Sequence, residues 1–140
     1  EMTAACTVVR TEARLKQCLG KLAELKDRYS RLRLADGASW TNQSFGYARS
    51  VGDMLVLAEA IALGALERRE SRGAHYRSDH TGRDDGNFMK TTLARHANGV
   101  TAVEFVPIDA SLILPTARTY GKKDSSPNAA AAPAMASAAS

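Results

Sequence analysis

A long apolar run in the middle of the chain constrains the fold more than any other feature. Between Met54 and Leu66, Glu59 is the one charged residue. Apolar residues from Phe45 onward recur at spacings of three and four, which predicts one helix from Phe45 to Arg69. The run is shorter than the about 20 apolar residues that a membrane span needs. Because a helix that is apolar on nearly every face is normally covered all round, we expect a central helix with more apolar surface than this chain can cover.

A second, amphipathic helix precedes the central one. Thr11 is a typical N-cap residue, and apolar residues follow it on one stripe that includes Leu15 and Leu22. Gly20 lies inside this helix and indicates a close helix crossing. Residues 2–9 predict a short helix or an entry segment, and we expect a bundle of about three helices. We expect Trp40, just before the central helix, to close one end of this bundle.

The C-terminal part predicts a β-hairpin and then a tail. Asn98-Gly99 separates two alternating runs, which is the strongest short-range hairpin signal. From residue 122 onward the chain is mostly Ala, Ser and Pro, and it cannot offset its own ordering entropy. We therefore predict a mainly α fold: a three-helix, spectrin-repeat-like bundle, then a β-hairpin and an extended C-terminal tail. Residues 1–121 would form one helical domain, and residues 122–140 a disordered tail.

The charge pattern excludes some classes of function. The formal net charge of +4 matches the excess between residues 10 and 36, which hold eight basic and four acidic side chains. Because basic and acidic residues are mixed in this segment and it has few aromatic residues, it predicts a solvated face and no nucleic-acid partner. Two cysteines, Cys6 and Cys18, are too few for a disulfide framework and predict reduced thiols in a cytosolic protein. The start at Glu1 fits a piece of a longer protein.

A densely charged loop follows the central helix. Between residues 67 and 85 there are five arginines and five acidic residues, so the local charge cancels. We expect Gly73 to cap the helix in a left-handed conformation. Mixed charges at this density predict ion pairs, either within the chain or to a partner.

The same loop resembles a segment of known flavoproteins. The sequence Glu70-Ser71-Arg72-Gly73-Ala74-His75-Tyr76-Arg77, followed by Asp79 and by Arg83-Asp84-Asp85, is similar to the C-terminal helical domain of the flavoprotein subunits of succinate dehydrogenase and fumarate reductase. L-Aspartate oxidase carries a looser version. The resemblance extends from about Met2 to Tyr120. His80 and Thr81 depart from the family, which usually has an aromatic residue and a proline after the aspartate.

The resemblance implies a parent enzyme. That oxidoreductase would interconvert succinate and fumarate, with FAD taking the hydride and electrons passing to an iron–sulfur subunit and a membrane quinone. It would lie peripherally on the cytoplasmic face of the inner membrane, held through partner subunits and their membrane anchor. The family places its flavin and substrate groups in other domains, and this chain has no Gly-x-Gly-x-x-Gly motif after a strand. We therefore expect FAD in the parent and none on this chain, which we expect to be inactive alone, and we assign no catalytic or cofactor-binding residue.

Six loop residues are candidates for an interface. They would hold this domain against the flavin-binding domain of the parent chain and brace its contact with the iron–sulfur subunit: Arg72, His75, Tyr76, Arg77, Asp79 and Arg83. The other interpretation is that the polar ones only pair with each other and cap the helix. A metal site that uses the same loop and His96 is not favoured, because no cysteine lies near, and we assign no metal ligand.

Two alternative functions stay open. The chain could be a stand-alone helical protein-interaction module with no enzyme attached, or the C-terminal domain of L-aspartate oxidase. The hairpin and the Arg83-Asp84-Asp85 continuation favour the respiratory flavoproteins over the oxidase.

Overall fold

The structure, a computed structural model, describes residues 1–113 and 116, in two units. The first unit is Glu1–Ile108 and the second is Asp109–Ser140. In the second unit, the described residues belong to no helix or strand. The tail predicted to be disordered, residues 122–140, lies outside the described residues.

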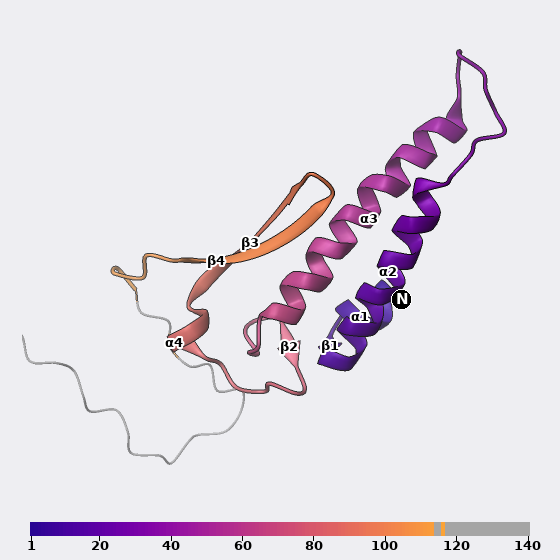
Figure 1. Cartoon of the computed structure of the whole chain (residues 1–140). Helices are drawn as coiled ribbons and strands as arrows, with labels where there is room; N and C mark the ends of the chain where they lie inside the picture. The colour runs from indigo at the N-terminus through magenta and orange to yellow at the C-terminus, as the bar shows by residue number, and fades with distance from the viewer. Residues whose placement is uncertain (114–115, 117–140) are drawn as a thin grey trace, which may run out of the picture. The chain divides into compact units, whose positions relative to one another are not determined.

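Two long helices dominate the first unit. Helix α2 (Glu12–Ser30) and helix α3 (Gln43–Glu67) run antiparallel and are joined by a loop at one end (Figure 1). Each begins at a side-chain N-cap, which for α2 is Thr11, as the sequence predicts. The side chain of Thr11 accepts a hydrogen bond from the backbone N–H of Arg14, and that of Asn42 accepts one from Phe45. These bonds satisfy N–H groups that the first turn of a helix leaves without partners.

The third helix of the predicted bundle is short. Helix α1 (Met2–Cys6) has five residues and packs against both long helices. Strand β1 (Val9–Arg10) follows after Thr7 and Val8, and the β-branched residues there favour an extended backbone. The mainly helical domain is therefore confirmed, but a spectrin-repeat-like set of three comparable helices is not present in the described part of the chain. The small core where the helices meet includes Ala5, Cys18, Leu22 and Ala62.

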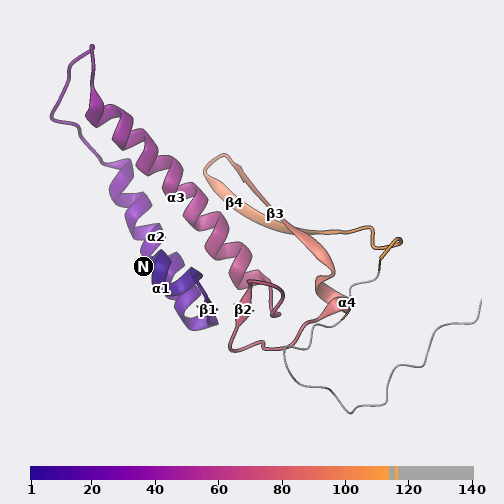
Figure 2. The same cartoon turned by 180° about the vertical axis from the view of Figure 1, so that it is seen from behind.

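The predicted β-hairpin is confirmed. Strands β3 (Lys90–Ala97) and β4 (Val100–Pro107) pair antiparallel, with Ala97 opposite Val100. Asn98 and Gly99 have φ angles of 52° and 77°, as a two-residue type I′ turn requires. A short helix, α4 (Asp85–Phe88), precedes the hairpin, and both strands pack against α3, as Figures 1 and 2 show from opposite sides.

Glu59, the acid that interrupts the apolar run, joins three elements. Lys26 of α2 donates to both of its carboxylate oxygens at 3.0 Å, and the Thr101 hydroxyl of β4 donates to one of them. Burial raises the pKa of Glu59, but the hydrogen bonds from Thr101 and Lys26 outweigh burial, and the pKa lies below its usual value. The charge in the middle of α3 therefore ties α2 and the hairpin to it.

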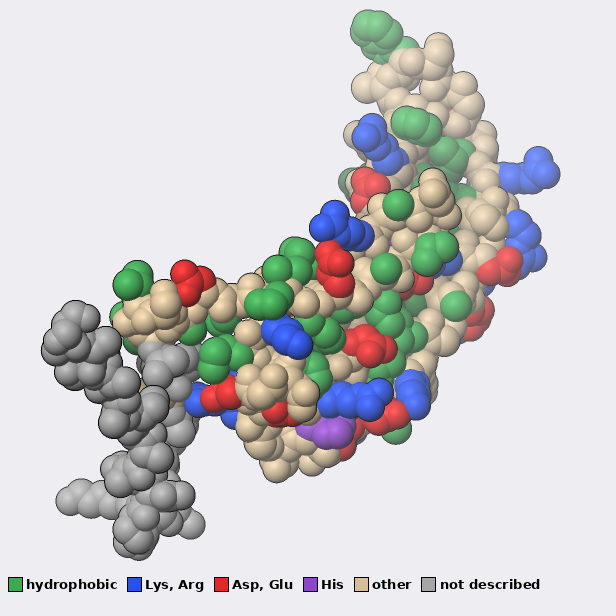
Figure 3. Space-filling model, turned by 60° about the vertical axis from the view of Figure 1, so that its left-hand side comes forward, with side chains coloured by type: hydrophobic (Ala, Val, Ile, Leu, Met, Phe, Trp, Pro, Cys, Tyr) green, Lys and Arg blue, Asp and Glu red, His purple; other side chains and the backbone are tan. Residues whose placement is uncertain are grey.

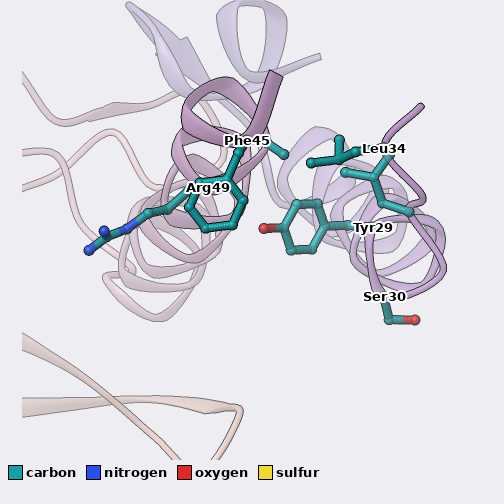
Figure 4. A pocket seen from close by; sticks show the side chains of 7 residues that line it. Tyr29, Ser30, Leu34, Phe45 and Arg49 are labelled. Carbon is teal, nitrogen blue, oxygen red and sulfur yellow. The ribbon is translucent and has the colours of Figure 1, made fainter. Parts of the chain in front are cut away.

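Two expectations about the helix pair are wrong. Trp40 is 88% exposed and does not close the bundle. The end of the bundle opens instead into a groove of about 450 Å³, where Tyr29 and Leu34 lie opposite Phe45 (Figure 4). The close crossing is not at Gly20, which has open space around it, but at Gly52, where an added Cβ would come within 2.5 Å of the Tyr29 hydroxyl oxygen.

The central helix keeps a large exposed apolar surface, as the sequence predicts. Tyr47, Met54, Leu57 and Ile61 of α3 are all exposed. Hydrophobic side chains also gather between charged ones on the face shown in Figure 3. In the described part of the chain, no helix is long and apolar enough to span a membrane.

Alanine substitutions at two glycines test the close crossing. In α2, Gly20→Ala should raise the free energy of unfolding by about 0.5–1 kcal/mol, because alanine favours the helix and meets nothing. In α3, Gly52→Ala should leave the free energy of unfolding unchanged or lower it, because the Tyr29 ring must move. Urea unfolding followed by circular dichroism measures both changes. An equal gain at both positions would contradict the crossing at Gly52.

Candidate functional site

The charged loop follows α3 in the chain, and its side chains link the C-terminal end of α3 to the N-terminal end of α2. Helix α3 ends at Glu67, and strand β2 (Tyr76–Arg77) pairs in parallel with β1, so that Arg77 lies opposite Arg10. The sequence suggested that Gly73 caps the helix, but it does not. With φ of 59° it lies in a tight turn, where the backbones of Arg72 and His75 exchange hydrogen bonds. The C-terminal carbonyls of α3 find another partner.

That partner is Arg77, whose side chain is fully buried. One Nη donates to the carbonyl oxygens of Ala65 and Leu66 at 2.9 and 3.1 Å. Its Nε and other Nη form a bidentate pair with Asp79 at 2.8 and 2.7 Å. A guanidinium at the C-terminal end of a helix is also favoured by the helix dipole. Arg77 therefore supplies the helix cap that we expected from Gly73.

Asp79, the partner of Arg77, extends this contact to α2. Its carboxylate accepts the backbone N–H of Glu12, in the first turn of α2, at 2.8 Å. The Arg77 guanidinium holds the pKa of Asp79 well below its usual range. The pair thus bridges the negative end of α3 and the positive end of α2, each with the matching charge.

Glu70 is the second buried centre, with no exposed surface. Its carboxylate accepts hydrogen bonds from Arg68, from two nitrogens of Arg72 and from the backbone N–H of Asp84. Burial raises the pKa of Glu70, but these donors outweigh burial and the pKa lies below its usual value. A buried carboxylate is stable when donors surround it in this way.

Arg68 joins this centre to the hairpin. Its guanidinium donates to Glu70, to the Thr92 hydroxyl and to the carbonyls of Phe88 and Lys90. It also lies 5.7 and 5.5 Å from the ring centroids of Phe88 and Phe105, within cation–π range. The loop, the short helix α4 and the base of the hairpin therefore form one connected network.

The remaining candidates lie at the edge of the network. Arg83 pairs with Asp85, which also binds Arg72. His75 is half-buried, with Nε2 3.1 Å from the carbonyl oxygen of Arg68, and burial lowers its pKa. Tyr76 is 41% exposed, the outward residue of β2. All six candidates are thus on or beside one network, whose charged members pair within the chain.

The histidines of the metal hypothesis are not brought together. His96 lies on the hairpin, beside Thr101, and His75 faces the end of α3. Asp79 and His80 do come near Glu12. However, both oxygens of Asp79 accept from Arg77, so the carboxylate is already neutralised by a cation. Chemically, this arrangement fixes backbone segments in place.

Three residues in or beside the network were not predicted as site residues. Glu70 appeared only in the charged stretch and in the motif of the resemblance, Arg68 only in the charged stretch, and Arg10, which borders the network, only in the basic region. The alternation of Arg and acid across Arg68, Glu70 and Arg72 was the available signal, since residues two apart on a loop can share one partner. Nothing local indicates that Arg10 would lie beside the loop.

Arginine geometry should be essential at Arg77. In the separate chain, Arg77→Lys should lower the free energy of unfolding by roughly 3–5 kcal/mol, because a lysine cannot cap α3 and pair bidentately with Asp79. The control is Arg95→Lys, in an exposed pair with Glu104 on the hairpin, which should cost about 0–1 kcal/mol. Chemical denaturation of both variants measures the difference, and similar costs would contradict a buried bridge.

Acid should weaken the domain through Asp79 and Glu70. Their pKa values are lowered in the folded state, so protons bind the unfolded chain more tightly. Stability is therefore fully present above the ordinary carboxyl pKa of about 4 and is lost as the pH falls below it. Melting temperatures between pH 7 and pH 2 should show this fall, and Asp79→Asn should make it shallower. The exposed control Glu104→Gln should not, and an unchanged slope in Asp79→Asn would refute the assignment.

Comparisons with known proteins place this chain in one family. The family described as the C-terminal domain of fumarate reductase flavoproteins matches residues 1–120. The chain is 43% identical over 124 residues to the succinate dehydrogenase flavoprotein subunit of Bacillus subtilis, covering 87% of this chain and 21% of that protein. It is 40% identical over 131 residues to the fumarate reductase flavoprotein subunit of Haemophilus influenzae, covering 93% and 22%.

Solved structures agree with the sequence matches. A variant of the E. coli quinol fumarate reductase superposes with a TM-score of 0.80 at 39% identity, over 88% of this chain and 22% of that one. A quinol–fumarate reductase with menaquinol molecules gives 0.76 at 39% identity, over 82% and 20%. The chain spans about a fifth of the length of the curated relatives it matches. It belongs to the family of C-terminal domains of succinate dehydrogenase and fumarate reductase flavoprotein subunits.

Proposed function

We propose that this chain is the structural and interface domain of a FAD-dependent flavoprotein that interconverts succinate and fumarate. The observation that carries the proposal is the match over residues 1–120 to a domain of such flavoproteins. In this proposal the parent passes electrons to an iron–sulfur subunit and then to a quinone. It lies peripherally on the cytoplasmic face of the inner membrane, through partner subunits.

The FAD belongs to the part of the parent outside this chain. Dinucleotides are held at a glycine-rich turn between a strand and a helix of a parallel sheet. Among the described residues, parallel pairing is limited to Val9–Arg10 with Tyr76–Arg77. The described residues therefore do not fit a dinucleotide site, and no step of the redox chemistry is assigned to them.

The domain's own task is to present a fixed surface to the rest of the parent. Buried pairs around Glu70 and Arg77 hold the loop from Arg68 to Asp85 against both long helices. The six interface candidates then have two different roles: Arg72, His75, Tyr76, Arg77, Asp79 and Arg83. The buried members shape the loop, and the partly exposed ones, with Tyr76 foremost, make contact.

A stand-alone helical interaction module is the alternative. The exposed apolar residues of α3, such as Met54 and Leu57, would fit either the rest of a parent flavoprotein or a separate protein partner. The two functions differ in what the natural protein contains beyond this chain.

Purification of the full-length natural protein separates these functions. It should carry flavin absorbance after dialysis and reduce an artificial electron acceptor when succinate is added. The separate 140-residue chain, prepared in parallel, should show neither property. A full-length protein without flavin would contradict the proposed function, and flavin on the separate chain would contradict the placement of FAD.

A further inference from the structure

A groove between α3 and β3 has an apolar floor and a basic end. Leu57 and Ile61 of α3 and Thr92 and Ala94 of β3 line it, and its volume is about 410 Å³. At the end nearest the charged loop, the lining includes Arg10, Arg68 and His75. Leu57 and Ile61 are also more than half exposed, so the groove continues the exposed apolar surface of α3.

Arg10 lacks the carboxylate partner that four arginines of the neighbouring charged loop have. Arg68, Arg72, Arg77 and Arg83 each pair with a carboxylate. Arg10 donates one hydrogen bond, from Nη1 to the carbonyl oxygen of Ala74 at 3.0 Å. Its Nε is buried with no partner, and no described residue offers it a carboxylate. A guanidinium N–H that is buried without an acceptor is unfavourable, and a carboxylate is the acceptor that suits it best.

Neighbouring groups do not supply a counter-ion. The guanidinium of Arg68 is engaged by Glu70 and by the Lys90 carbonyl of the hairpin, and as a cation it offers Arg10 no counter-charge. Burial, and then the arginines around it, lower the pKa of His75, and an imidazole supplies no negative charge. The basic end of the groove therefore has one positive group that needs an anion, next to apolar surface that needs cover.

We propose that this groove docks a segment of the flavin-carrying part of the same parent chain, with a carboxylate on Arg10 and an apolar side chain against Leu57 and Ile61. Charge complementarity at Arg10 requires an acid, and the apolar floor requires more than a free anion. The chain spans about a fifth of its curated relatives, so most of the parent lies outside it and is tethered to it. This inference rests on the proposed function, because it needs the same parent chain.

Zero-length cross-linking in the full-length flavoprotein tests the docking. Arg10→Lys keeps the positive charge and introduces an amine that carbodiimide couples to a carboxylate in contact with it. Mass spectrometry should then find a cross-link from position 10 to an Asp or Glu outside residues 1–140. The matched control is Arg14→Lys, at an exposed position that forms no ion pair with a described residue. It should give several-fold less of this product.

Hydrogen exchange gives an independent measurement. Amides of residues 57–64 should be better protected in the full-length protein than in the separate chain. Arg10→Gln should reduce that protection several-fold, and Arg14→Gln should leave it unchanged. Cross-links only within residues 1–140, or to a second copy, would overturn the proposal, as would equal exchange in the full-length protein and the separate chain.

Flavin content distinguishes the two ways to fail. A yellow, succinate-oxidising parent without the cross-link would refute the docking and leave the proposed function intact. A cross-link in a parent without flavin would refute the proposed function and leave the docked groove in place.

Discussion

The bridge between Arg77 and Asp79 is the interaction on which the rest of the domain depends. Two antiparallel helices meet here with opposite partial charges at their ends, and the carbonyls of α3 and an N–H of α2 both need partners. One ion pair, between the buried guanidinium of Arg77 and the partly exposed carboxylate of Asp79, satisfies both. Because the guanidinium also spans two consecutive carbonyls, it stops α3 at a defined residue and fixes the direction in which the loop leaves. Glu70, Arg68 and the base of the hairpin are positioned from that point.

The central helix, α3, is buried on one side and leaves apolar side chains exposed on its other faces. It contributes Ala62 and Ala65 to the buried set, and small residues there let neighbouring elements approach closely. Large side chains on its other faces are left in water. Such a surface is costly for a free protein and ordinary for a domain of a larger one. Glu59 fits this arrangement, since its charge lies where three elements of the same domain meet and not on the apolar face left open.

Local signals in the sequence predicted the elements well. Thr11 as a cap and Asn98-Gly99 as the hairpin turn could be predicted, because each depends on a few adjacent residues. Trp40, Gly20 and Gly73 were misjudged, because what surrounds them depends on segments distant in the chain. The same holds for the site. The charged loop was recognised, yet the pairing of Arg77 with helix ends, and the isolation of Arg10, follow from contacts that no local pattern encodes.

The bridge also sets an order of events during synthesis. Asp79 accepts from Glu12, which lies 67 residues earlier, and β1 pairs with a strand equally distant in the chain. Helix α2 is therefore made well before the groups that seal the meeting ends, and α3 is complete shortly before them. A nascent chain released or stalled before residue 79 would hold α2 and α3 with open termini and an apolar flank, and it would be a natural target for chaperones. Closing this long loop is the step that we expect to limit folding, since distant contacts form more slowly than local ones.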